Sequence, residues 1–458
     1  MRTTQPARGG AGLASRLAHL TGGALFLSGA LCVAQSAAAA DSGSLGGLDA
    51  IYPALQALYI DLHKSPELSL QEEKTAARMA ARLRDLGYEV TERIGGHGVV
   101  GVLRNGAGPT VALRTDFDGL PVKEQTGLAF ASTATAKNSA GDMVPVMHAC
   151  GHDVHMTAWI GAATLLASSK HEWKGTLLLI GQPAEEVVRG ARAMVDDGLF
   201  TRFPKPDYVL GIHVSQALPA GQIGVVSGPA SAASNTVEIT FFGKGGHGAI
   251  PHQTIDPIVM ASRAVVTLQT IVSREVDPLD SAVVSVGFFQ AGTKHNIIPD
   301  EARLGLTVRA YKPEVQKKVL ASIERIVKAE AMAAGASRDP AVVINEREGA
   351  EVVVNDPDLC ARLTMALGRA LGESNVVAAE PQMTSEDFGV YGRAAGAPSV
   401  QFRIGAIDPE VFADAKSRGR LLLLPGPHSP QFAPDYEPTI RTAVAAFVVS
   451  TRALLGSH

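Results

Sequence analysis

The sequence has few cysteines, no long apolar run and little net charge. Each of these absences excludes some classes of protein. Cysteine occurs only three times in 458 residues, which leaves few thiols for disulfides or for metal ligands. Basic and acidic residues nearly balance, 41 against 45, and neither kind forms a stripe or a tail. Nucleic acid is therefore not an expected partner. No internal repeat or low-complexity linker interrupts the chain.

The first 40 residues differ from the rest because they have the pattern of a signal peptide. Three arginines precede an apolar run over residues 24–33, and alanines at 37–40 offer a cleavage site before Asp41. A membrane anchor is the alternative, but the run has about ten residues and a spanning helix needs roughly 20. We therefore expect an exported protein, periplasmic or secreted, with no membrane attachment once residues 1–40 are removed.

The length of 458 residues exceeds the size at which single hydrophobic cores stop growing, and this predicts two domains. Short apolar, strand-like runs alternate with helical patterns, which indicates an α/β fold with a central mixed or parallel sheet. We assign residues 41–228 and 346–458 to this layered domain. Residues 229–345 interrupt it.

The interrupting segment has its own pattern. The order of its elements is that of a ferredoxin-like β-α-β-β-α-β fold. Alternation along Ala302, Leu304, Leu306 and Val308 indicates a sheet with one covered face and one free face. We therefore expect a small α+β lid domain here. Its predicted strands are 237–241, 282–289, 302–308 and 341–344, and its predicted helices are 257–274 and 313–334.

The sequence HACGHD at 148–153 sets Cys150 two residues before His152. The pair could bind a metal, although a buried cysteine is more often a small inert side chain. Cys150 and Cys360 could instead form a disulfide in an oxidising compartment. We favour a metal thiolate at Cys150 and an inert, packed Cys360, because only the neighbours of Cys150 are of ligand type.

Three predicted strands end in residues that can bind a metal or transfer a proton. The residues are Asp116 and Asp118, Glu185 and Glu186, and His213. Ligands of open α/β sheets bind beyond the carboxyl ends of the strands, so these side chains should meet. Taken singly, such an Asp often caps a helix and paired Glu are usually solvated. Their coincidence with the 148–153 motif favours a site, and a loop histidine near the C-terminus adds a further imidazole.

Adjacent glutamates have a chemical use at such a site. From an irregular turn, Glu186 can bind a metal while Glu185 takes a proton from a water molecule. Two ions about 3.5 to 4 Å apart would also explain why more ligands are present than one tetrahedral ion uses.

Seven motifs follow one another along the chain. They are RTDFDGLP at 114–121, HACGHD at 148–153, QPAEE at 182–186, GGHGAIPH at 245–252, HNIIP at 295–299, MTSEDF at 383–388 and HSP at 428–430. In this order they resemble the dinuclear metal-dependent amidohydrolases. The similar branch contains hippurate hydrolase, bacterial N-acyl-amino-acid amidohydrolases and the plant hydrolases of indole-acetyl amino acids. The resemblance covers essentially all of the chain after residue 40.

The resemblance implies a site with two divalent ions, Glu185 as general base and Asp118 as an outer carboxylate that orients a ligand. The thiolate of Cys150 would take the place of a bridging aspartate in more distant carboxypeptidase relatives. The ions would be zinc, manganese, cobalt or nickel, and a soft thiolate shifts the preference among them. The implied metal ligands are Cys150, His152, Glu186, His213 and His428.

In the lid domain, the resemblance assigns roles to His247, Asn296 and Arg309. His247 would stabilise the oxyanion of the scissile carbonyl, often across a dimer interface, which implies a homodimer through the lid. Asn296 and Arg309 would bind the substrate carboxylate, for which an arginine fork is suited. By themselves, the residues also allow an ordinary glycine-rich turn at His247 and a solvated Arg309 on the polar face of its strand.

Other features near the expected site keep two interpretations. His148, His155 and His252 lie near it according to the resemblance, but structural histidines are equally expected there. Residues 130–146 form a longer run than the corresponding loop of the family. This run either shapes the acyl pocket or is a surface excursion.

We therefore expect an exported amidohydrolase that cleaves N-acyl amino acids, hippurate-like or related conjugates, with water activated by two divalent ions and Glu185. A dipeptidase or carboxypeptidase with the same machinery is one alternative. It would differ in tolerating a free amino group beside the scissile bond. A non-catalytic periplasmic protein that binds metal or amino acids is the other alternative, and it would not need Glu185.

Overall fold

The computed structural model describes residues 45–456, apart from the side chains of residues 346–348. The predicted signal peptide at 1–40 lies outside the described residues. Among the helices of this described part, none combines the length and the apolar character that crossing a membrane requires.

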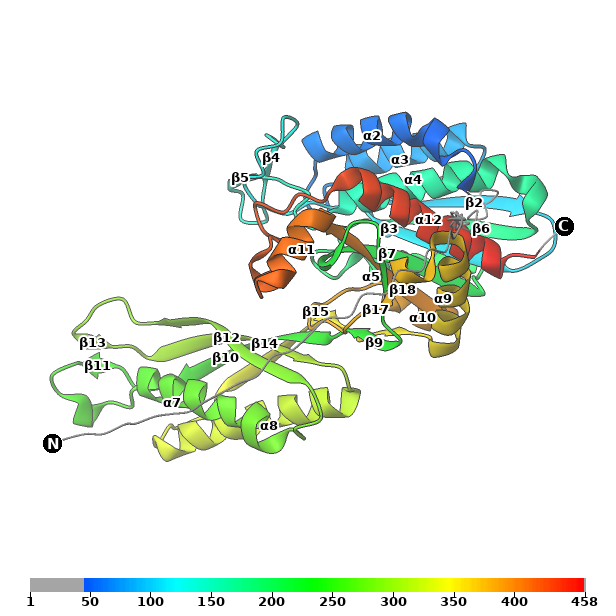
Figure 1. Cartoon of the computed structure of the whole chain (residues 1–458). Helices are drawn as coiled ribbons and strands as arrows, with labels where there is room; N and C mark the ends of the chain where they lie inside the picture. Colours follow the sequence, from blue (N-terminus) through cyan, green and yellow to red (C-terminus); the bar gives the residue numbers. More distant parts are fainter. Residues whose placement is uncertain (1–44, 457–458) are drawn as a thin grey trace, which may run out of the picture. The chain divides into compact units, whose positions relative to one another are not determined.

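An eight-stranded mixed sheet forms the centre of the larger domain (Figure 1). The neighbours β6, β3, β7 and β18 are mutually parallel, whereas β1, β2 and β6 pair in antiparallel fashion. The expected α/β fold with a mixed sheet is confirmed. Across the sheet the strands are β1 (Glu89–Ile94), β2 (Gly98–Asn105), β6 (Gly175–Gln182), β3 (Thr110–Asp116), β7 (Tyr208–Pro219), β18 (Ser399–Ile407), β8 (Ile223–Val225) and β17 (Val376–Ala378).

Helices cover both faces of this sheet. One hydrophobic cluster joins it to α2 (Leu48–Lys64), α3 (Glu73–Asp85), α4 (His152–Ser168), α9 (Pro357–Leu371) and α12 (Tyr436–Leu454). A second cluster joins it to α5 (Gly190–Asp196), α6 (Leu199–Arg202) and α10 (Gly389–Ala395). Val111 and Leu113 of β3 belong to the first cluster and Ala112 to the second. Because both faces of the sheet are covered here, the strand is apolar at all three of these consecutive positions.

The position of α4 matters most for the site. This helix is buried on nearly every side and packs against α2, α12 and the central sheet. Gly151 precedes it with a φ of 79°, and a Cβ there would lie 2.6 Å from Val214 Cγ2. Only glycine fits such a left-handed, crowded position. The helix therefore begins at His152, two residues after Cys150.

A separate antiparallel sheet forms the predicted lid, in the order β12-β14-β10-β15. This is the strand order of a ferredoxin-like fold, and α7 and α8 share one hydrophobic cluster with it. The predicted covered face is confirmed, since Ala302, Leu304, Leu306 and Val308 are all buried. The elements are β10 (Ala233–Phe242), α7 (Pro257–Thr270), β12 (Ala282–Ala291), β14 (Glu301–Ala310), α8 (Pro313–Ala333) and β15 (Ala341–Ala350).

Short strand pairs complete the fold. The pair β9 (Gly228–Ser231) and β16 (Val353–Asn355) joins the segments just before and just after the lid sheet. The predicted boundaries at 228/229 and 345/346 fall close to it and stay predictions. Other pairs are β11 (Gly246–His247) with β13 (Ile297–Ile298), and β4 (Thr135–Lys137) with β5 (Met143–Pro145), while α11 (Pro409–Ser417) follows β18.

Candidate metal centre and active site

Three neighbouring strands bring the expected residues together. Asp116 is the last residue of β3, and Glu185 and Glu186 follow β6, its direct neighbour. His213 was expected just after a strand that ends at 212. Instead β7 continues to Pro219, and His213 lies within it, paired in register with Arg403 of β18. The ladder therefore holds His213 more firmly than a loop would.

The five predicted metal ligands form one cluster. Cys150 Sγ lies 3.4 Å from His213 Nε2, and His428 Nε2 lies 3.3 Å from Glu186 Oε2. His152 Nε2 lies 3.7 Å from Glu186 Oε1. The donor atoms of Cys150, His152 and His213 lie within 4.8 Å of one another, and so do those of Cys150, Glu186 and His428. The two ligand groups share Cys150.

The cluster fits a divalent metal ion. His152 Nε2 and Glu186 Oε1 are buried and have no hydrogen-bond partner in the described part of the chain, which is costly unless a cation binds there. Burial disfavours the charged form of His152, but Asp116 and Asp118 outweigh burial and raise its pKa to about 10. Negative charge thus exceeds positive charge around Nε2. A donor set of thiol, imidazole and carboxylate suits borderline-soft divalent ions.

Two histidines are oriented by backbone carbonyls. His152 Nδ1 donates to Asp118 O at 2.8 Å, and His213 Nδ1 donates to Val214 O at 2.7 Å. With Nδ1 carrying the proton, the lone pair of each Nε2 is free for a metal.

The Asp118 carboxylate fixes the turn that carries both glutamates. It accepts hydrogen bonds from the backbone N–H of Glu185 at 3.2 Å and of Glu186 at 3.0 Å, and from Ser69 Oγ at 2.6 Å. Its distance to His152 Nδ1 is 3.5 Å. The Asp118 carboxylate therefore lies behind the cluster, where a carboxylate that orients a ligand is expected. Two of these three hydrogen bonds come from the turn that carries the glutamates.

Cys150 and Glu185 have environments that matter for chemistry. Burial, with help from the carboxylates of Glu186 and Glu185, raises the pKa of the Cys150 thiol well above its usual range. A divalent cation would displace that thiol proton, because metal ligands bind deprotonated.

Burial, together with Glu386 and Glu186, raises the pKa of the Glu185 carboxyl well above its ordinary value. A carboxylate with a raised pKa is a stronger base.

A buried arginine network lies behind Glu185 and was missed in the sequence. Arg114 forms ion pairs with Asp116 at 2.6 Å, Glu386 at 3.0 Å and Asp387 at 3.2 Å. Its Nε also donates to Gln182 at 2.8 Å. Three of these partners are buried acids, and buried acids need such a counter-charge. The adjacent acids at 386 and 387, within one of the seven motifs, were the signal that could have revealed it.

The cluster opens into a cavity of about 610 Å³. Cys150, Glu185, Glu186, His213 and His428 line it together with lid residues, among them Arg309. Arg309 is half-buried and donates to Met383 O at 3.2 Å and to Ser385 Oγ. The predicted substrate-binding arginine therefore faces the same space as the predicted metal ligands.

His247 and Asn296 lie elsewhere. Both are exposed on the β11–β13 part of the lid, where Gly248 N donates to Asn296 O at 2.9 Å. Neither is among the described residues that line the 610 Å³ cavity. The structure does not bring them to the cluster of their own chain. Their predicted roles stay predictions.

The other histidines differ in their surroundings. His155 Nδ1 donates to Asp116 at 2.7 Å and its Nε2 accepts from Val214 N at 3.0 Å, so both nitrogens serve the structure. His148 is buried without a hydrogen-bond partner among the described residues, and burial lowers its pKa to about 4. His252 is exposed. Cys150 and Cys360 are both free and buried.

Backbone strain gathers at the cluster. Ala184 has a φ of 53°, Val188 of 54° and His428 of 71°, a left-handed conformation that non-glycine residues adopt only at a cost. Ala184 and Val188 flank the two glutamates, and His428 is itself a predicted ligand. Strain of this kind is typical of functional sites.

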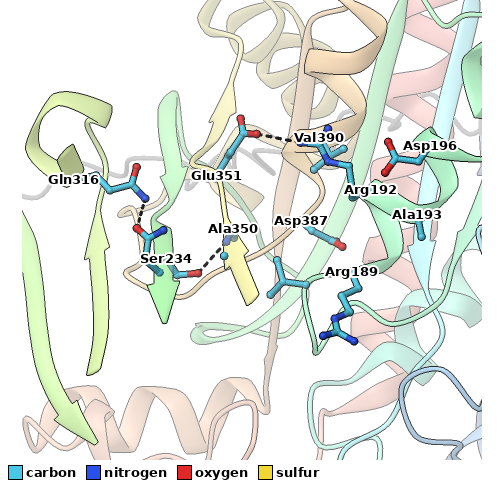
Figure 2. A pocket seen from close by; sticks show the side chains of 13 residues that line it. Arg189, Arg192, Ala193, Asp196, Ser234, Gln316, Ala350, Glu351, Asp387 and Val390 are labelled. Atoms are coloured by element: carbon cyan, nitrogen blue, oxygen red, sulfur yellow. Dashed lines mark hydrogen bonds and ion pairs between the residues drawn. The ribbon is translucent and has the colours of Figure 1, made fainter. Parts of the chain in front are cut away.

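A second cavity of about 620 Å³ adjoins the first (Figure 2). Val188 and Ser234 line both cavities. Figure 2 shows Ser234 bonded to Ala350, where Ser234 Oγ accepts from Ala350 N at 3.1 Å. These two residues are close to the start of β10 and at the end of β15, so the cavity lies where the chain passes into and out of the lid sheet.

Comparisons with known proteins show the family of this chain. A model of peptidase family M20/M25/M40 matches residues 112–416, and the chain belongs to this family. A hippurate hydrolase from Campylobacter jejuni is 41% identical over 332 residues, which are 72% of this chain and 82% of that protein. A probable hydrolase from Synechocystis is 37% identical over 397 residues, which are 86% of this chain and 94% of that protein.

Solved structures show the same fold. A dinuclear metal binding peptidase of family M20 from Bacillus subtilis matches with a TM-score of 0.70 at 30% identity, over 89% of this chain and 100% of that one. Together, family, fold and ligand cluster make this protein a metal-dependent amidohydrolase.

Proposed function

We propose that this protein hydrolyses the amide bond of N-acyl amino acids. The observation that carries the proposal is the cavity that holds the ligand cluster, the buried Glu185 and the guanidinium of Arg309 in one space. A carboxylate bound by Arg309 would fix the amino-acid end of a substrate. The relative named hippurate hydrolase acts, by its name, on an N-acyl amino acid, which supports the same class here.

We propose that two divalent ions bind to the two ligand groups that share Cys150. One group consists of Cys150, His152 and His213, and the other of Cys150, Glu186 and His428. Such ions, when bound, polarise the amide carbonyl and lower the pKa of water.

Glu185 is the proposed proton carrier. Its Oε2 lies 3.8 Å from His152 Nε2, beside the ligand cluster. The Glu185 carboxylate is not one of the proposed metal ligands, so it is free to exchange a proton. As a base it takes a proton from the attacking water. As an acid it then gives this proton to the nitrogen of the leaving amine. Its buried position keeps bulk water from competing for the proton.

The remaining predictions form part of the proposal. His247 and Asn296 would complete the site from a second copy of the chain, in a homodimer through the lid. The enzyme would be exported to the periplasm or secreted, as the pattern of residues 1–40 predicts.

The decisive experiment is the variant Glu185→Gln. We expect it to keep fold and bound metal but to lose about 10²- to 10⁴-fold in kcat, because glutamine cannot carry the proton. Glu89→Gln, which changes a glutamate whose side chain is 75% exposed, is the matched control and should keep wild-type activity. Full activity of Glu185→Gln would contradict the mechanism.

A substrate panel tests the class. N-acetyl and N-benzoyl amino acids should be hydrolysed, whereas dipeptides with a free amino group should be poor substrates. The reverse preference would assign the site to a dipeptidase or carboxypeptidase.

A further inference from the structure

A buried arginine that the proposed mechanism does not use lines the active-site cavity. Arg403 lies in β18, paired in register with His213, and only 4% of its surface is exposed. It faces the cavity that also holds Cys150 and Arg309.

The hydrogen-bond partners of this guanidinium in the described part of the chain are all neutral. One terminal nitrogen donates to Ser231 Oγ at 2.7 Å and to Ala230 O at 3.4 Å, and the other donates to Gln401 Oε1 at 3.5 Å. Its Nε is buried and has no hydrogen-bond partner among the described residues. Arg114, in contrast, is paired with three carboxylates.

A buried cation without a paired carboxylate is unfavourable by itself. Burial lowers the pKa of Arg403, and the carboxylate of Glu386 opposes this effect less strongly, so the charge is only partly compensated. An anion that enters the cavity would gain a charge-assisted hydrogen bond there. A ligand that supplies a negative charge would stabilise this buried guanidinium.

Arg403 and Arg309 are held by the same segment. Arg309 donates to Met383 O and to Ser385 Oγ, and Ser231, the partner of Arg403, forms a bridge with Gln382. The two guanidinium groups are thereby tied to residues 382–385. Two cations that line the same cavity can bind two anionic groups of a single amino-acid moiety.

We propose that Arg403 is a specificity-determining residue that binds a second carboxylate of the substrate, so that the preferred substrates are N-acyl derivatives of acidic amino acids. Arg309 binds the α-carboxylate and Arg403 the side-chain carboxylate of an aspartyl or glutamyl group. This inference rests on the proposed hydrolysis of N-acyl amino acids.

The test compares substrates that differ in charge but hardly in shape. We expect kcat/KM for N-acetyl-L-glutamate to exceed that for N-acetyl-L-glutamine by about tenfold or more in the wild-type enzyme. Arg403→Gln should lower this ratio by about 10- to 100-fold, mainly through KM for the acidic substrate. Arg303→Gln removes an arginine from an exposed ion pair with Glu238 and should leave the ratio unchanged.

Each other result has a defined meaning. If Arg403 only stabilises the fold, Arg403→Gln lowers both activities equally and the ratio stays constant, which overturns the inference. A wild-type enzyme that prefers the glutamine substrate overturns it too, even if no variant folds. Hydrolysis of neutral N-acyl amino acids without preference for acidic ones leaves the proposed function standing and this inference refuted. If no N-acyl amino acid is hydrolysed, both are refuted.

Discussion

His63 is a buried histidine whose charge supports the first turn of α4. Its Nδ1 lies 2.7 Å from Asp153 Oδ2 and its Nε2 lies 3.0 Å from Glu124 Oε1. Burial disfavours its charged form, but the hydrogen bonds and charges of Asp153 and Glu124 outweigh burial and raise its pKa to about 9. Since the pKa is higher in the folded protein than in the unfolded chain, the protonated form favours folding.

This shift predicts a defined pH dependence of stability. The contribution of His63 is complete below about pH 6.5 and is lost as the pH rises through about 9. The difference in free energy of unfolding between wild type and His63→Gln should therefore shrink by up to about 3 kcal/mol over this range. Urea unfolding at several pH values measures it. His171→Gln, at a side chain that is 78% exposed, is the control, and a constant difference for His63→Gln would contradict the prediction.

Among single residues, the sequence reveals those whose side chains are typical metal ligands or proton carriers. Four of the predicted ligands stand in recognisable motifs and His213 follows an apolar, strand-like run, and the structure places all five together. Arg403 was not found, because an isolated arginine in an apolar strand gives no local signal. Its importance depends on Ser231 and Gln401 and on the cavity, and these neighbours meet only in the folded chain.

Among the elements, strand β18 shows why some secondary structure escaped prediction. It reads SVQFRIGAI, and Gln401 and Arg403 interrupt its apolar pattern although all of its residues are buried. Gln401 bonds to Asn355 and Glu386, so its polar groups are satisfied by distant segments. Helix α9, in contrast, has local start and stop signals in the sequence: an aspartate N-cap, a proline in the first turn and a glycine after its last residue.

The hairpin of β4 and β5 is the element for which the sequence left two interpretations. No described residue of 130–146 lines the 610 Å³ cavity. Contacts of the hairpin with the domain include a bond from Gln71 Nε2 to Lys137 O at 2.9 Å. These observations favour a surface excursion over an acyl pocket.

A deletion tests this interpretation. Replacing residues 136–144 by Asn-Gly, which favours a tight hairpin turn, should change kcat/KM by less than about threefold and stability by less than about 1 kcal/mol. The measurements are the kinetics with N-acetyl and N-benzoyl amino acids and a urea melt. A change in the preference for the acyl group would show that the hairpin shapes the substrate pocket after all.

For the whole molecule, the central question is how His247 meets the cluster. It is exposed on the lid and does not line the cavity of its own chain. In a homodimer through the lid, the His247 of one copy would serve the cluster of the other.

Complementation between two inactive variants tests this arrangement. Co-expression of Glu185→Gln and His247→Ala should restore about a quarter of wild-type activity, because half of the dimers are mixed and each mixed dimer has one intact site. Glu185→Gln with Glu186→Ala is the control and should stay inactive, since both changes fall in the same site. Activity that does not return in the first mixture would show that His247 acts within its own chain or not at all.

The left-handed residues at the cluster bear on how such an enzyme can be made more heat-resistant. Glycine at Ala184, Val188 or His428 would remove strain of order 1–3 kcal/mol per residue. The same exchange would free the turn that aims Glu185 and Glu186, and at 428 it would delete a ligand. Glycine substitutions at these positions would therefore raise thermal stability but lower the turnover number.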